Sequence, residues 1–126
     1  MSTKSQANTI QSILTFWFGP PDSPEYGADR AAWFVKDLQF DAEIKSKFES
    51  VLETVAGGQG ELMADCPEGA VAAVVVLDQF PRNIFRDDAR AFATDDAARR
   101  VAGAAIAQGF DDQLTTEMRR FLYMPF

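Results

Sequence analysis

The chain has 126 residues, of which 47% are hydrophobic and 12% are aromatic. This length fits a single domain over residues 1–126, and this apolar content predicts a globular protein with a substantial core. The net charge of −7 argues against a nucleic-acid binder, and the absence of any uncharged apolar run of about eighteen residues argues against a membrane-spanning segment.

Two residue counts restrict the chemistry that this chain can perform. The sequence contains no histidine, which excludes hydrolase mechanisms with a histidine base and most transition-metal sites within the chain. Cys66 is the only cysteine, so no internal disulfide can form, and a single thiol suits a reducing compartment. The N-terminus is polar and lacks the apolar run of a signal peptide. We therefore expect a cytoplasmic protein.

Hydrophobic periodicity predicts helices in the N-terminal half. The first helix covers residues 9–18 and is ended by a Gly-Pro-Pro sequence. A short helix over residues 31–35 follows, with Asp29 as its cap. A longer amphipathic helix starts at Asp41 and ends at the glycine-rich residues 57–60.

The C-terminal half also reads as helical. A helix that begins at Pro67 is buried on every side, and it is expected to stop near Gln79 because Pro81 disfavours helix at the preceding residue. Thr94 is expected to cap the next helix, and the last helix begins at Thr115 or the threonine after it. Alternation typical of strands is absent. The prediction is an all-α fold with five or six helices in antiparallel hairpins.

Residues 77–86 bring charged, amide and aromatic residues together directly after the most apolar run of the chain. Asp78 shares a helical face with the valines three, four and seven residues before it, so its carboxylate is expected on the core side. A buried acid is costly unless it is paired, and Arg82 and Arg86 are the nearest candidate partners.

This candidate cluster contains Asp78, Gln79, Arg82, Asn83 and Arg86. In the favoured interpretation it is a structural network of ion pairs and hydrogen bonds, because buried charges are usually paired for that reason. In the alternative, the arginines and Asn83 bind an anionic small molecule, with Asp78 as a base or an orienting group. The cluster has more donors than one carboxylate needs, so both interpretations stay open.

Other patterns have simpler explanations. Five aromatic residues could surround the cluster, but at helical spacing such residues are more often core: Trp17, Trp33, Phe80, Phe85 and Tyr123. The glycines of residues 57–60 follow a helix instead of a strand, which does not fit a phosphate-binding loop. Pairs of adjacent aspartates fall at helix starts, where acids are expected without a ligand. We therefore expect no metal and no cofactor.

The most specific motif is Leu77-Asp78-Gln79-Phe80-Pro81-Arg82-Asn83, followed by Arg86. Supporting segments extend over nearly the whole chain: Phe16-Trp17-Phe18, Trp33-Phe34, Phe40-Asp41, Gly60-Glu61-Leu62, Ala91-Phe92-Ala93, Asp95, and Phe121-Leu122-Tyr123-Met124-Pro125-Phe126. On these residues the chain resembles the bacterial domain-of-unknown-function family numbered 924. The resemblance implies a tetratricopeptide-like helical fold and no established activity.

The chain departs from that family's pattern at three places. Members commonly have glycine where this chain has Asp87, and a tryptophan often found shortly after Leu62 is missing. Members also usually continue beyond Phe126 with an acidic, histidine-containing segment and further helices. We expect this segment to be missing here, and with it any family function that needs its histidine.

Two functions from different classes follow. A helical interaction module would bind a protein or peptide in the groove of stacked hairpins, and the aromatic residues 121–126 would promote self-association unless something covers them. A small-molecule enzyme or binder would instead hold an anionic ligand at the Asp/Arg residues. The first is favoured, because no nucleophile and base can be paired from this chain.

Overall fold

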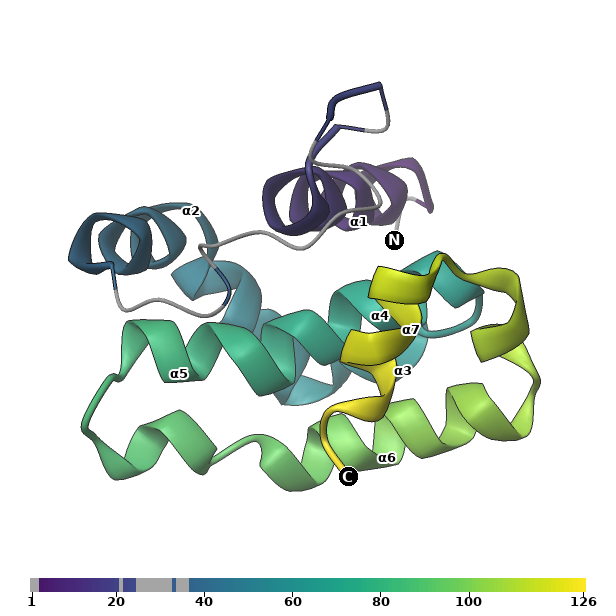
Figure 1. Ribbon diagram of the computed structural model, residues 1–126. Coiled ribbons are helices and arrows are strands. Elements are labelled where there is room, and N and C mark those ends of the chain that lie inside the picture. Colours follow the sequence, from purple (N-terminus) through teal and green to yellow (C-terminus); the bar gives the residue numbers. More distant parts are fainter. Residues whose placement is uncertain (1–2, 21, 25–32, 34–36) are drawn as a thin grey trace.

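The computed structural model describes residues 3–20, 22–24, 33 and 37–126 (Figure 1). These residues form helices and turns and no strand, so the all-α prediction is confirmed. The short helix predicted over residues 31–35 and its cap Asp29 lie outside the described residues, apart from Trp33.

The first two helices are α1 (Thr3–Phe18) and α2 (Leu38–Thr54). Asp37 caps α2, because its Oδ1 accepts hydrogen bonds from the backbone N–H groups of Gln39 and Phe40 at 3.0 and 3.1 Å. The predicted start at Asp41 is therefore wrong. Asp41 lies in the first turn of α2 and is buried.

The glycine-rich segment breaks the helix, as predicted. In η2 (Val55–Gln59), which follows α2, the backbone at Gly58 is not helical, and the short helix α3 (Gly60–Met63) begins after this break. Gly58 has φ of 120°, which a residue with a side chain rarely adopts, so the turn depends on glycine at this position.

The valine-rich segment forms one rod of three consecutive pieces, α4 (Pro67–Val74), the π-helical turn η3 (Val75–Gln79) and α5 (Phe80–Ile84). Cys66 caps the rod through its Sγ, which accepts from the N–H of Gly69 at 3.4 Å. The predicted stop near Gln79 is wrong. The π turn inserts an extra residue before Pro81, which has no N–H to donate, and the helix continues beyond it.

The remaining elements are η4 (Ala89–Phe92), α6 (Asp95–Ala107), η5 (Phe110–Gln113) and α7 (Thr116–Tyr123). The last helix begins at Thr116, as predicted, and Thr115 caps it by accepting from the N–H of Met118 at 3.2 Å. Thr94 does not cap α6 through its side chain, so that prediction is wrong. Its hydroxyl donates instead to the carbonyl of Leu77 at 2.6 Å.

The α4–α5 rod lies at the centre of the fold (Figure 1). It runs antiparallel to α6, while α1 and α2 cover its other side and α7 crosses α4. Residues 70–77 are all at most 1% exposed, which confirms the prediction of a helix buried on every side. In the described part of the chain, no helix combines the length and the apolar character that crossing a bilayer requires.

Candidate functional site

Asp78 lies in the π turn η3 and is 4% exposed. Its Oδ2 accepts from Gln79 Nε2 at 2.7 Å, and its Oδ1 lies 3.2 Å from Arg82 Nη1. Burial raises the pKa of Asp78 above its usual value, while the hydrogen bond from Gln79 and the charge of Arg82 act in the opposite direction. The expected burial and pairing of this acid are both found.

Arg82 connects the rod to α6. It donates from Nη1 and Nη2 to the two oxygens of Asp95, each at 3.1 Å, and Nη1 also donates to the backbone carbonyl of Asp78. The π turn and Pro81 leave carbonyls of the rod without the usual helical donor, and side chains take that place. Arg82 binds the carbonyl of Asp78, and Thr94 binds that of Leu77.

A second ion pair connects the rod to α2. Arg86 Nε lies 2.7 Å from Asp41 Oδ2, and Arg86 Nη2 lies 2.9 Å from Asp41 Oδ1. Asn83 Nδ2 donates to the same Oδ1 at 2.8 Å. Arg86 therefore pairs with Asp41 and not with Asp78, which corrects the expectation from the sequence.

We call Asp41, Asp78, Arg82, Arg86 and Asp95 the Asp/Arg cluster. Sequence reasoning from the residues missed Asp41 and Asp95, because each was assigned to a helix start. The family resemblance could have indicated both residues, because Asp41 and Asp95 are among the positions that carry it. Bidentate contacts to carboxylates occupy donors of both guanidinium groups, so the cluster is well suited to hold three helices together.

An open depression of ≈ 530 Å³ adjoins the cluster. Its lining includes both guanidinium-bearing residues, the acids Asp87 and Asp88, and the ring of Phe92. The carboxylate of Asp88 accepts hydrogen bonds from the backbone N–H and the guanidinium of Arg90. The depression has the size of a small-molecule site, but carboxylates already surround its two cations.

The five predicted aromatic residues lie in different environments. Trp17 and Phe80 are core side chains with ring centroids 5.8 Å apart, and Trp33 Nε1 donates to the carbonyl of Trp17 at 2.9 Å. Phe85 stacks under Arg90, whose Cζ lies 4.4 Å from the ring centroid. Tyr123 is 41% exposed and its hydroxyl donates to Asp111, which raises the pKa of the phenol.

Among the residues that the structure describes, no group of three Cys, Asp or Glu side chains is arranged to hold a metal ion.

The comparison with protein families matches residues 13–126 to the model of a bacterial protein of unknown function, DUF924. The chain belongs to this family. A solved structure of a protein of unknown function from Agrobacterium tumefaciens is similar to it, with a TM-score of 0.81 and 33% sequence identity. That match covers 95% of this chain and 64% of the relative, so the chain spans less than two thirds of the relative's length. Among curated proteins, the comparison finds no match.

The polar residues of the DUF924 motif hold the end of the rod in place through hydrogen bonds. Asp78, Arg82, Asn83 and Arg86 each make a hydrogen bond that joins the end of the rod to itself or to α2 and α6. Asp87 has φ of 65° and is the one non-glycine residue with positive φ in the described part of the chain. This conformation favours glycine, which is the residue that the family resemblance implies at this position.

Proposed function

We propose that this DUF924 member is a cytoplasmic interaction module that binds a protein or peptide partner. The supporting observation is a set of large hydrophobic side chains that are exposed although the core is well filled. They are Leu38 (71%), Leu62 (57%), Phe92 (59%), Tyr123 (41%), Met124 (39%) and Phe126 (69%). Three of them belong to one face of the molecule, together with part of the Asp/Arg cluster.

We define the Phe92–Phe126 face by Gln79, Arg82, Phe92, Met124 and Phe126. The Cζ of Arg82 lies 5.2 Å from the ring centroid of Phe92. Gln79 Nε2 lies 3.3 Å from the Sδ of Met124, two residues before Phe126. These contacts connect the rod to Phe92 in η4 and to Met124 after α7.

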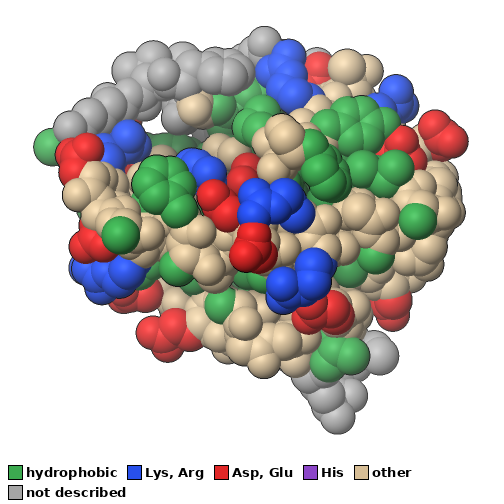
Figure 2. Space-filling view, turned by 90° about the horizontal axis from the view of Figure 1, so that it is seen from below, with side chains coloured by type: hydrophobic (Ala, Val, Ile, Leu, Met, Phe, Trp, Pro, Cys, Tyr) green, Lys and Arg blue, Asp and Glu red, His purple; other side chains and the backbone are tan. Residues whose placement is uncertain are grey.

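The helix α6 forms the floor of this face. Asp95, Arg99 and Gly103 are spaced four residues apart, so they lie along one side of α6. Asp95 binds Arg82, Arg99 pairs with the neighbouring Asp96, and the ring of Phe126 comes within 4.0 Å of the position that a Cβ on Gly103 would occupy. Figure 2 looks onto this side of the molecule, where hydrophobic side chains adjoin charged side chains of both signs.

The composition of the face supports protein binding. Phe, Met and Arg are enriched at the centres of protein interfaces, and a fixed guanidinium beside an exposed ring loses little conformational freedom on binding. The ion pairs hold Arg82 in place before any partner arrives. The Asp/Arg cluster therefore acts as a scaffold that presents the Phe92–Phe126 face.

Selection from a displayed peptide library tests this proposal. Enriched peptides are measured by fluorescence anisotropy against the wild type and against Phe92→Ser and Phe126→Ser. We expect at least tenfold weaker binding for each variant, because each removes an apolar anchor. Leu38→Ser, which removes an equally exposed side chain at the start of α2, is the control and should bind as the wild type does. Failure to enrich any peptide, or equal affinities for all variants, would overturn the proposal.

The depression beside Arg82 and Arg86 favours a second candidate, the binding of an anionic small molecule. It ranks lower because the carboxylates of the Asp/Arg cluster already neutralise both guanidinium groups. Calorimetric titration with inorganic phosphate and with citrate distinguishes binding of an anion from binding of a peptide. Saturable binding that is lost in Arg86→Lys, with the fold retained, would favour this second function.

A further inference from the structure

The elements that carry the Phe92–Phe126 face are helical. Its residues come from η3, α5, η4 and the segment after α7, over the floor formed by α6. The described residues form no strand, so the face offers no sheet edge to which an extended peptide could add its backbone. A helix satisfies its own backbone N–H and C=O groups and binds through its side chains. The face therefore fits a helical partner better than an extended one.

The spacing of the two exposed rings also suits a helix. Arg82 binds Asp95 and lies against Phe92. Phe126 lies beside Gly103, eight residues after Asp95, which is about 12 Å along α6. In Figure 1, η4 is in line with α6 and before its start, so the rings are separated by at least about 12 Å, or two turns of a helix. On a partner helix, residues seven or eleven positions apart lie on one side and span two or three turns.

The depression beside Phe92 carries an excess of negative charge. The two guanidinium groups of the Asp/Arg cluster are already bound by Asp41 and Asp95. Asp87 lines the same depression, is exposed, and makes no hydrogen bond or ion pair with any residue that the structure describes. The other acid in the lining, Asp88, pairs with Arg90. The carboxylate of Asp87 is therefore available to a cation, and the net charge of −7 attracts a basic partner to the molecule.

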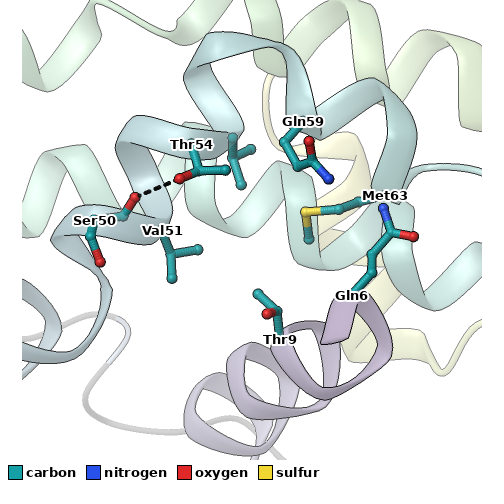
Figure 3. A pocket seen from close by; sticks show the side chains of 8 residues that line it. Gln6, Thr9, Ser50, Val51, Thr54, Gln59 and Met63 are labelled. Atoms are coloured by element: carbon teal, nitrogen blue, oxygen red, sulfur yellow. Dashed lines mark hydrogen bonds between the residues drawn. The ribbon is translucent and has the colours of Figure 1, made fainter. Parts of the chain in front are cut away.

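A cavity on another side of the fold does not share this charge. It has a volume of ≈ 210 Å³ and lies between α1, α2 and α3 (Figure 3). The described residues that line it are uncharged, among them Gln6 from α1 and Val51 from α2. A basic helix finds no counter-charge there, so electrostatic attraction favours the Phe92 end of the face.

We infer, on the basis of the proposed function, that the partner of the Phe92–Phe126 face is a basic amphipathic helix. Two apolar side chains, seven or eleven positions apart, pack on Phe92 and Phe126. A lysine or arginine one turn beyond the first of them pairs with Asp87. Salt weakens this attraction, whereas it strengthens the association of two copies that repel each other, so opposite salt dependences distinguish the two occupants.

Three synthetic peptides on an alanine background test the inference. The basic peptide has leucine at i, i+7 and i+11, with lysine one turn before the first leucine and one turn after the last. The acidic peptide has glutamate in place of lysine. The third peptide has the composition of the first, but its leucines stand at i, i+5 and i+10 and point to three sides of the helix. Fluorescence anisotropy measures the affinity of each peptide for the wild type.

We expect the basic peptide to bind at least tenfold more tightly than the other two at about 0.02 M NaCl, and more weakly at about 0.5 M. Equal affinity for the basic and acidic peptides, or for the two arrangements of leucine, would overturn the inference. If no designed peptide binds while the displayed library yields binders, the inference fails and the proposed function stands. If the library yields none, both fail.

A variant pair isolates the charge of Asp87. Asp87→Asn removes the charge and tolerates the positive φ, so the basic peptide should bind at least threefold more weakly and with less dependence on salt. Glu53→Gln makes the same change of charge at an exposed position of α2, on the other side of the rod, and should leave the affinity unchanged. Equal affinities in the two variants would show that Asp87 does not pair with the peptide, which contradicts the inference. The comparison of the peptides on the wild type does not depend on how the variants fold.

Discussion

Asp41 and Asp78 are the two buried acids of the described core, and their surroundings differ. Both oxygens of Asp41 are bound by Arg86, with Asn83 as an additional donor, so its charge is fully compensated. Asp78 shares Arg82 with Asp95, and burial dominates its titration. We conclude that the Asp41–Arg86 pair connects α2 to the rod, whereas burial disfavours the ionised form of Asp78.

The first prediction concerns the Asp41–Arg86 pair. Arg86→Ala should lower the free energy of unfolding by about 2 kcal/mol, because it removes the bidentate cationic partner of a buried carboxylate. Arg90→Ala is the control, since Arg90 is 67% exposed and solvent screens its pair with Asp88, so this variant should lose less stability. Urea denaturation of both variants measures the difference. Similar losses for the two would show that the Asp41–Arg86 pair does not hold α2 to the rod.

The second prediction follows from the raised pKa of Asp78. In the pH range between its unfolded and folded pKa values, the folded state binds more protons, so the contribution of Asp78 to stability falls as the pH rises. Asp78→Asn removes this titration and should gain stability relative to the wild type as the pH rises above 3.8, the usual pKa of an aspartate. Urea denaturation across that range measures it. A difference that is constant with pH, or that changes in the wild type's favour, would contradict the assigned direction.

The third prediction concerns Asp87 and its positive φ of 65°. Asp87→Gly should raise the free energy of unfolding by roughly 0.5 kcal/mol, since glycine adopts this conformation without steric cost but is more flexible when unfolded. Asp87→Ala should lower it by roughly 0.5–1 kcal/mol, because alanine tolerates the left-handed region less well than aspartate. Thermal unfolding of both variants checks the opposite signs. Shifts of the same sign would show that backbone strain at this residue is not the controlling factor.

At the scale of elements, the main feature is a helix that continues past a proline. The N–H of Phe80 donates to the carbonyl of Val75, five residues earlier, and this wider turn places Pro81 at the start of α5. The carbonyls that are left over accept from Arg82 and Thr94. Continuation of the rod therefore depends on side chains supplied by its own next turn and by the start of α6.

The fourth prediction tests that dependence. Thr94→Val keeps the shape of the side chain but removes the donor to the carbonyl of Leu77, and should cost about 1–2 kcal/mol of unfolding free energy. Thr94→Ser retains the hydroxyl and should cost less than about 0.5 kcal/mol. Chemical denaturation of the two proteins provides the measurement. Equal stabilities would mean that solvent satisfies this carbonyl and that the hydroxyl is dispensable.

The distance between partners along the chain determined what the sequence could predict. Asp78 and Arg82 are four residues apart on one helical surface, so their pairing followed from local periodicity. Asp41 and Arg86 are 45 residues apart, and nothing local indicates that α2 would pack against α5. The π turn was missed for a related reason, since the hydroxyl that binds the carbonyl of Leu77 comes from Thr94, 17 residues away along the chain.

At the scale of the whole molecule, the exposed apolar face favours association of two copies, whereas the net charge of −7 makes the copies repel each other. The Phe92–Phe126 face itself is close to neutral, because Arg82 and Arg99 lie beside Asp95 and Asp96. Repulsion between two copies therefore arises from the rest of the surface, and salt screens it. The Debye length falls from about 30 Å at 0.01 M salt to about 10 Å at 0.1 M, so association through this face should depend on ionic strength.

The fifth prediction is self-association that increases with salt. Light scattering should give a higher average mass for the wild type at about 0.5 M NaCl than at about 0.02 M, because screening removes the repulsion while the apolar contact persists. The double variant Phe92→Ser/Phe126→Ser should keep the monomer mass at both concentrations, and Leu38→Ser should behave as the wild type does. A wild-type mass that does not change with salt would rule out a second copy as the occupant, so that the Phe92–Phe126 face would serve a different protein or peptide. Association that persists in the double variant would place the contact on another surface.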